Sequence, residues 1–193
     1  MISPSTEICI EGFPRSANSF CTTSFQLMNP EVRCAHHLHI PMQVIRAVEL
    51  NIPCIVLIRN PLDAIASVLV ADRNLSPELA LQSYINFYQK ILQLKDKVVV
   101  AEFNQTIKDI KQVILSVNSH YNCDFNAQDM TPSMTEEVFF RIKEVNKTLK
   151  QSSNLVAIPT EAKNKLKQEV IPELKQHPKL AEAESIYKQF LQN

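Results

Sequence analysis

A loop near the N-terminus, residues 12–20, carries side chains that suit an anion. It contains the guanidinium of Arg15, and Ser16, Asn18 and Ser19 contribute short hydroxyl or amide side chains. Free N–H groups and the macrodipole at a helix start attract negative charge, and such side chains add further donors. The loop is therefore predicted to hold an oxyanion; alternatively, it is a capped helix start with Arg15 in solvent. It also contains Gly12, the single glycine of the chain.

These residues do not form a Walker loop for a nucleoside triphosphate. The pattern G-x-x-x-x-G-K-[ST], started at Gly12, would need a glycine at Ala17 and a lysine at Asn18. Both are missing, so the lysine that reaches the β- and γ-phosphates is absent. A P-loop small-molecule kinase is therefore only the less favoured alternative.

A second pair of residues could also bind an anion. Arg59 follows the apolar run Pro53–Ile58, which is typical of a strand buried on both faces. Ser67 lies eight residues after Arg59, about two turns into the next helix. The two side chains can converge on one anion near that helix start. Alternatively, Arg59 caps a sheet edge and Ser67 is a small residue at a helix–sheet contact.

The elements that must position these residues alternate between strands and helices. Strands are predicted at residues 7–11, 32–35, 53–58 and 98–101, and helices at 16–28, 41–50, 61–71, 77–94, 107–117, 135–149, 160–174 and 180–191. The alternation predicts an α/β fold of three layers, a parallel sheet with helices on both faces, whose ligands bind at the carboxyl ends of the strands. We expect a single domain over residues 1–193, with an α/β core at 5–125 and a C-terminal helical extension at 130–193.

The composition excludes several classes of protein. Lys plus Arg and Asp plus Glu both number 20, and a net charge of zero argues against nucleic acid or an anionic membrane as the main partner. Five cysteines without a CxxC pair do not predict a disulfide framework or structural zinc. The first eleven residues lack a signal-peptide pattern, and the apolar run at 64–71 is too short to span a bilayer. We expect a cytoplasmic protein.

Together, the two anion motifs resemble those of sulfotransferases that use 3′-phosphoadenosine 5′-phosphosulfate (PAPS). Residues 14–20, PRSANSF, resemble the family's P-[KR]-S-G-T-[TS]-[WF] loop for the 5′-phosphosulfate. Residues 59–67, RNPLDAIAS, resemble its 3′-phosphate motif R-[ND]-P-x-D-x-x-x-S at the same spacing. The resemblance covers residues 7–120. It implies a P-loop, sulfotransferase-like fold and transfer of a sulfuryl group from PAPS to a hydroxyl or amine of a small-molecule or glycan acceptor.

The resemblance also implies roles for individual residues. It assigns the donor to Pro14, Arg15, Ser16, Ala17, Asn18, Ser19, Phe20, Arg59 and Ser67. Arg15 would contact the 5′-phosphosulfate and stabilise charge on its bridging oxygen, with the neighbouring polar side chains donating to the same group. Phe20 would lie near the adenine, and Arg59 and Ser67 would bind the 3′-phosphate.

A base for the acceptor hydroxyl is expected among three histidines at residues 36–39. In the family a histidine follows the second strand, often within K-T-H-x-P. His37 is the first candidate; His39, which has the family's spacing to Pro41, is the second, and His36 is the third. Three close histidines could instead bind a metal ion, but Cys34 is the only further ligand nearby. No metal is predicted.

The sequence departs from the family pattern at several positions. Ala17 replaces a glycine, which is tolerated if the residue is right-handed helical, Asn18 replaces a threonine, and Ala35 replaces a lysine. Asn104 and Gln105 replace an acidic pair, and the C-terminal helices lack the motif R-K-G. These changes keep open a non-catalytic relative that binds the nucleotide or a partner protein. The oligomeric state is not predicted, and a homodimer is compatible with the sequence.

Overall fold

The computed structural model describes residues 1–148 and 160–192. Its strands are β1 (Ile8–Gly12), β2 (Cys34–His36), β3 (Cys54–Ile58) and β4 (Val99–Glu102). Its helices are α1 (Asn18–Met28), α2 (Pro41–Glu49), α3 (Pro61–Ala71), α4 (Pro77–Ile91), α5 (Phe103–Lys108), α6 (Ile110–Tyr121), α7 (Pro132–Thr148), α8 (Glu161–Gln176) and α9 (Lys179–Leu191), with a short 3₁₀ helix η1 (Leu92–Lys97). No helix in these two stretches has the length and apolarity to cross a membrane.

The four strands form one parallel sheet in the order β2-β1-β3-β4. β1 therefore lies in the middle, between β2 and β3, and Gly12 at its end pairs with Leu57. A Cβ atom at Gly12 would come within 2.4 Å of the backbone oxygen of Leu57. The single glycine is thus explained by the close approach of β1 to β3 at this edge.

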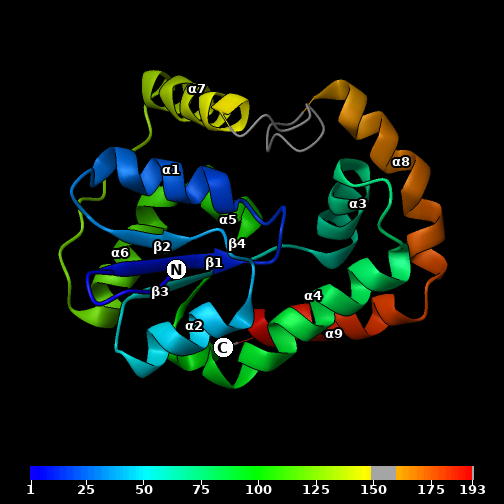
Figure 1. Cartoon of the computed structure of the whole chain (residues 1–193), viewed down its shortest axis with the longest axis horizontal. Coiled ribbons are helices and arrows are strands. Elements are labelled where there is room, and N and C mark those ends of the chain that lie inside the picture. Colours follow the sequence, from blue (N-terminus) through cyan, green and yellow to red (C-terminus); the bar gives the residue numbers. More distant parts are fainter. Residues whose placement is uncertain (149–159, 193) are drawn as a thin grey trace.

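Helices cover both faces of the sheet, as the sequence predicted (Figure 1). Alternate residues of β1 and β3 point to opposite sides because side chains alternate along a strand. Cys9, Val56 and Ile58 join a core with α2, α3, α4 and α9. Ile10 and Leu57 join a second core with α1 and α6. The prediction of an α/β fold with a parallel sheet is confirmed.

One predicted helix, over residues 107–117, is divided in the structure into α5 and α6. Asp109 lies between them with a non-helical backbone (φ −149°, ψ 73°), and its carboxylate accepts the N–H of Gln112 at 3.0 Å as the cap of α6. Glu102 caps α5 by accepting the N–H groups of Asn104 and Gln105. Each carboxylate satisfies N–H groups that have no partner within their helix.

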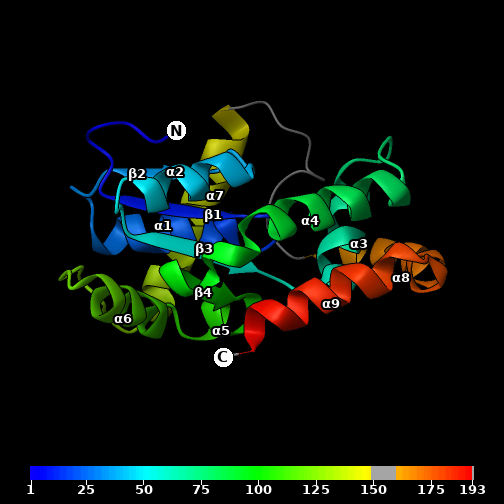
Figure 2. The same ribbon diagram turned by 90° about the horizontal axis from the view of Figure 1, so that it is seen from below.

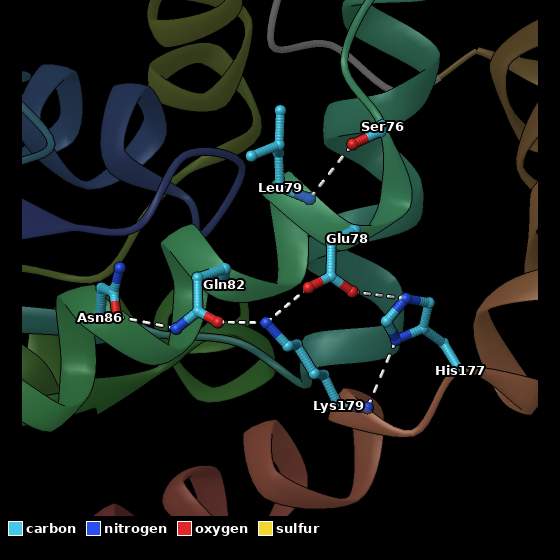
Figure 3. Close-up of polar contacts among 7 residues, drawn as sticks. All are labelled: Ser76, Glu78, Leu79, Gln82, Asn86, His177 and Lys179. Carbon is cyan, nitrogen blue, oxygen red and sulfur yellow. Dashed lines mark hydrogen bonds and ion pairs between the residues drawn. The ribbon is translucent and has the colours of Figure 1, made fainter.

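The C-terminal helices pack against the α/β core: α7 against α1, α8 against α3, and α9 against α4 (Figure 2). The corner between α8 and α9 is held at the start of α4 by Glu78, as Figure 3 shows. Its carboxylate lies 3.0 Å from Nε2 of His177 and 2.5 Å from Nζ of Lys179, which also donates to Gln82. This contact fixes the course of α8 along α3.

Candidate functional site

A cavity of about 640 Å³ lies where the loops after β1, β2 and β3 meet the helices α3, α7 and α8. Most of the predicted site residues line it: Pro14, Arg15, Ala17, Asn18, Ser19, Phe20, His37, His39, Arg59 and Ser67. Ser16 does not line the cavity and is fully buried. The backbone N–H of Ser16 donates to the carbonyl of Phe13 at 3.3 Å, within the turn that leads into α1.

The loop between β1 and α1 contains two residues with a left-handed backbone. Arg15 has φ 69° and Ala17, the N-cap residue of α1, has φ 71°. Ala17 is therefore not right-handed helical, which was the condition for tolerating alanine in place of the family's glycine. The chain must turn sharply from β1 into α1, and the side-chain amide of Asn18 fixes this turn by donating to the carbonyl of Phe13 at 2.9 Å. A left-handed conformation costs a non-glycine residue roughly 1–2 kcal/mol.

The two predicted anion motifs meet in a single site. Nε of Arg15 donates to the hydroxyl of Ser67 at 3.0 Å, and Nη1 of Arg59 donates to the backbone carbonyl of Arg15 at 3.1 Å. The guanidinium of Arg59 also lies 3.8 Å from the ring centroid of Phe103. Burial and the neighbouring charge of Arg59 lower the pKa of Arg15. The two guanidinium groups are thus held close together in spite of their like charge.

Two further cations reach the cavity from α8, Lys163 and Lys167. Burial and the charge of Arg15 lower the pKa of Lys163, and burial, Arg59 and Arg15 lower that of Lys167. Neither lysine was predicted from the sequence, because a pair four residues apart on an amphipathic helix has the same pattern as a solvated face. The cavity lining therefore holds four cations, and Asp72 contributes a carboxylate.

The rest of the cavity wall is largely apolar. It comprises Phe20, Val68, Val70, Ala71, Phe103, Ile107, Met130 and Phe139, together with the polar Thr135 and Asn146. The rings of Phe20 and Phe139 are 6.2 Å apart between centroids and tilted by 41°. Cations and aromatic rings in one cavity suit a ligand that combines anionic groups with a flat ring system.

His37 uses both ring nitrogens within the protein. Its Nδ1 lies 2.7 Å from Nδ1 of His36, and its Nε2 lies 3.1 Å from the hydroxyl of Ser19. Burial and the charges of His36 and His39 lower the pKa of His37 to about 4. Among the residues described, no three His, Cys, Asp or Glu side chains lie together so that they could hold a metal ion.

His39 is oriented differently. Its Nδ1 lies 2.8 Å from the carbonyl oxygen of Gly12, which can only accept, so Nδ1 carries the hydrogen. In the neutral ring the lone pair is then on Nε2, for which no partner is found in the described part of the chain. Burial lowers the pKa of His39, so the ring is neutral near pH 7. This arrangement leaves Nε2 able to accept a proton.

The histidine loop is held in place by Glu11, a fully buried residue of β1. Its Oε1 accepts the N–H of Leu38 at 2.9 Å and the side-chain amide of Gln43 at 3.2 Å, and its Oε2 accepts the N–H of His39 at 2.7 Å. Burial raises the pKa of Glu11 to about 7, although these hydrogen bonds favour the charged form. The sequence analysis missed Glu11, whose signal was a carboxylate inside an otherwise apolar strand.

Replacing Ala17 by glycine should stabilise the protein. Glycine adopts φ 71° without the steric cost that alanine has, at the expense of a more flexible unfolded chain, so the free energy of unfolding should rise by about 0.5–1 kcal/mol. The measurement is urea denaturation. Ala181→Gly, the same change on the exposed surface of α9, should lower the free energy of unfolding by about 1 kcal/mol. Equal losses in both variants would show that Ala17 is unstrained.

Glu11→Gln should change how stability depends on pH. The folded state binds the Glu11 proton more tightly than the unfolded chain, so this stabilisation is complete below about pH 4.5 and is lost as the pH rises through about 7. Glutamine does not titrate. The free energy of unfolding of the variant, relative to the natural protein, should therefore rise by up to about 3 kcal/mol between pH 4.5 and 8. Glu31→Gln, on the exposed surface, is the matched control, and a difference for Glu11→Gln that does not change with pH would contradict the assignment.

Comparison with known proteins gives a likeness in structure alone. No family model matches the sequence, and no curated protein matches it. Among solved structures, the crystal structure of mouse sulfotransferase SULT7A1 complexed with PAP is similar, with a TM-score of 0.53 and 12% sequence identity. The match covers 95% of this chain and 90% of that chain. The chain therefore has a sulfotransferase-like α/β fold.

Proposed function

We propose that this protein is a sulfotransferase, which moves the sulfuryl group of PAPS to an acceptor and leaves 3′-phosphoadenosine 5′-phosphate (PAP). The observation that carries the proposal is the set of four cations, Arg15, Arg59, Lys163 and Lys167, on one cavity at the carboxyl edge of a parallel sheet. A ligand with several negative charges would be attracted by all four cations at once. The fold shared with a sulfotransferase that was crystallised with PAP supports the same choice.

The residues around the cavity fit a donor with two separate anionic groups. The start of α1 and the guanidinium of Arg15 suit the 5′-phosphosulfate, since N–H groups at a helix start bind such anions. Arg59, close to Lys167 on α8, suits the 3′-phosphate. The aromatic rings of Phe20 and Phe139 suit the adenine.

The chemistry requires positioning and charge stabilisation more than covalent help. PAPS supplies an activated sulfuryl group with a phosphate as leaving group. His39 accepts the proton of the acceptor hydroxyl at Nε2 while the acceptor oxygen bonds to sulfur and the bond from sulfur to the 5′-phosphate oxygen breaks. Arg15 stabilises the negative charge that develops on that oxygen. The products are a sulfate ester and PAP, and the proton remains on His39 until it passes to solvent.

We assign the role of base to His39 and not to His37, which was the first candidate from the sequence. His39→Ala should lower kcat about 100-fold or more, because it removes the proton acceptor, and should leave PAP affinity within about twofold. His37→Ala should lower kcat less, because this ring acts through Ser19 and His36. Steady-state kinetics with PAPS and calorimetry with PAP measure both effects. The reverse order of kcat losses would return the role of base to His37.

PAP should bind at least tenfold more tightly than ADP, because only PAP carries a 3′-phosphate. Arg59→Lys keeps the charge but loses the planar fork, and Lys167→Met removes one charge, so each should weaken PAP binding about five- to tenfold and ADP binding much less. Calorimetry gives these constants. Lys175→Met, an exposed lysine of the same helix α8, is the matched control and should change neither. Equal affinities of the natural protein for PAP and ADP would overturn the proposal.

A protein that binds PAP without turnover is the second candidate. The strained Ala17 at a position where the family has glycine, and the replacement of the family lysine by Ala35, favour it. Tight PAP binding without sulfate transfer to a broad set of alcohols, phenols and amines would establish this second function. The cytoplasmic location stays a prediction from the sequence.

A further inference from the structure

A second, smaller cavity of about 290 Å³ adjoins the first. It is lined by Phe13, Pro14, His39, Pro41, Ser83, Asn86, Phe87 and Lys90. Pro14 and His39 line both cavities and therefore form the wall between them. A group transferred from one cavity to the other would pass this wall.

His39 lines both cavities, and the orientation of its ring determines which nitrogen can accept a proton. Its Nδ1–H is held by the carbonyl of Gly12, which leaves Nε2 as the acceptor. In a transfer through a loose transition state, the attacking and leaving oxygens lie roughly in line. With the leaving phosphate in the cationic cavity, the attacking hydroxyl must approach from outside that phosphate site, and the second cavity shares His39 with the first.

The lining of the second cavity has an apolar floor and a polar rim. Phe13 and Phe87 are buried and form the floor. Ser83, Asn86 and Lys90 form the rim on one face of α4, since they are spaced at about one and two helical turns. Oδ1 of Asn86 accepts from Gln82 at 2.9 Å, as Figure 3 shows, so its side-chain N–H groups are left as donors.

Lys90 is the charged side chain of this rim. It is exposed, and no ion pair of Lys90 is found in the described part of the chain. A cation beside donors over an aromatic floor suits a small anion that carries a flat ring. The volume lies just below the usual range for ligand pockets, which limits the ligand to a small one.

We propose that the second cavity binds the acceptor and selects a small ring compound that carries a hydroxyl and an anionic group, such as a carboxylate. The hydroxyl lies at His39, the ring on Phe13 and Phe87, and the anionic group at Lys90. This rests on the proposed function for the identity of the reaction, but the binding of the compound can be measured separately.

The probes are 4-hydroxybenzoate and its neutral methyl ester, which differ in charge and share the phenol ring. Binding of each is measured by saturation-transfer NMR on the protein saturated with PAP. 4-Hydroxybenzoate should bind more tightly than the ester. Lys90→Met should weaken the binding of 4-hydroxybenzoate about three- to fivefold and leave the ester and PAP unchanged. Lys175→Met, an exposed lysine on α8, should change none of them.

The assignment would be overturned by no binding of 4-hydroxybenzoate, by equal binding of the acid and the ester, or by an affinity for the acid that Lys90→Met leaves unchanged. A loss of affinity for the acid in Lys167→Met alone would place the acid in the cationic cavity and would also overturn it. Failure of PAP to bind would refute the proposed function instead. In that case, the effects of Lys90→Met and Lys167→Met on the binding of 4-hydroxybenzoate in the absence of PAP would decide whether the second cavity binds the acid.

Discussion

The site depends on the direct parallel pairing of β1 and β3. Parallel neighbours end at the same edge of a sheet, so the loops that follow them must share the same space. The guanidinium of Arg59 can therefore donate a hydrogen bond to the backbone carbonyl of Arg15, although the two residues are far apart in sequence. The pairing leaves no room for a side chain where the strands end, and Gly12 meets this requirement. Every other part of the site is arranged around this edge.

Around this edge the protein holds charged groups and backbone conformations that would be unfavourable in an unfolded, solvated chain. Cations repel one another across the cavity, and the carboxylate of Glu11 is buried beneath the histidine loop. Arg15, Ala17, His37 and His39 have left-handed backbones. Such features lower the stability of the folded chain and persist only where surrounding structure enforces them. Among the described residues, four of the six non-glycine residues with a positive φ lie around this one cavity, and the proposed ligand with several negative charges would offset the repulsion between its cations.

The sequence predicts the parts of this arrangement that local residues determine. The order of strands and helices, the loop at residues 12–20 and the pair Arg59 and Ser67 all follow from short patterns. Lys163 and Lys167 do not, because their place depends on how α8 packs along α3. The roles of Glu11 and His39 likewise depend on one hydrogen-bonded loop that no periodicity specifies. Alanine rarely adopts a left-handed backbone, so the conformation of Ala17 could not be predicted from its residue type.

The cavity shows how unevenly charge is distributed in a chain whose net charge is zero. Its lining carries four cations and the carboxylate of Asp72, a local charge of +3. Because the whole chain is neutral, the remaining residues must sum to −3. The excess of positive charge is therefore local to the pocket, although the chain as a whole is neutral. Such a pocket attracts small anions over about 8–10 Å at moderate ionic strength, without the broad basic surface that an extended polyanion requires.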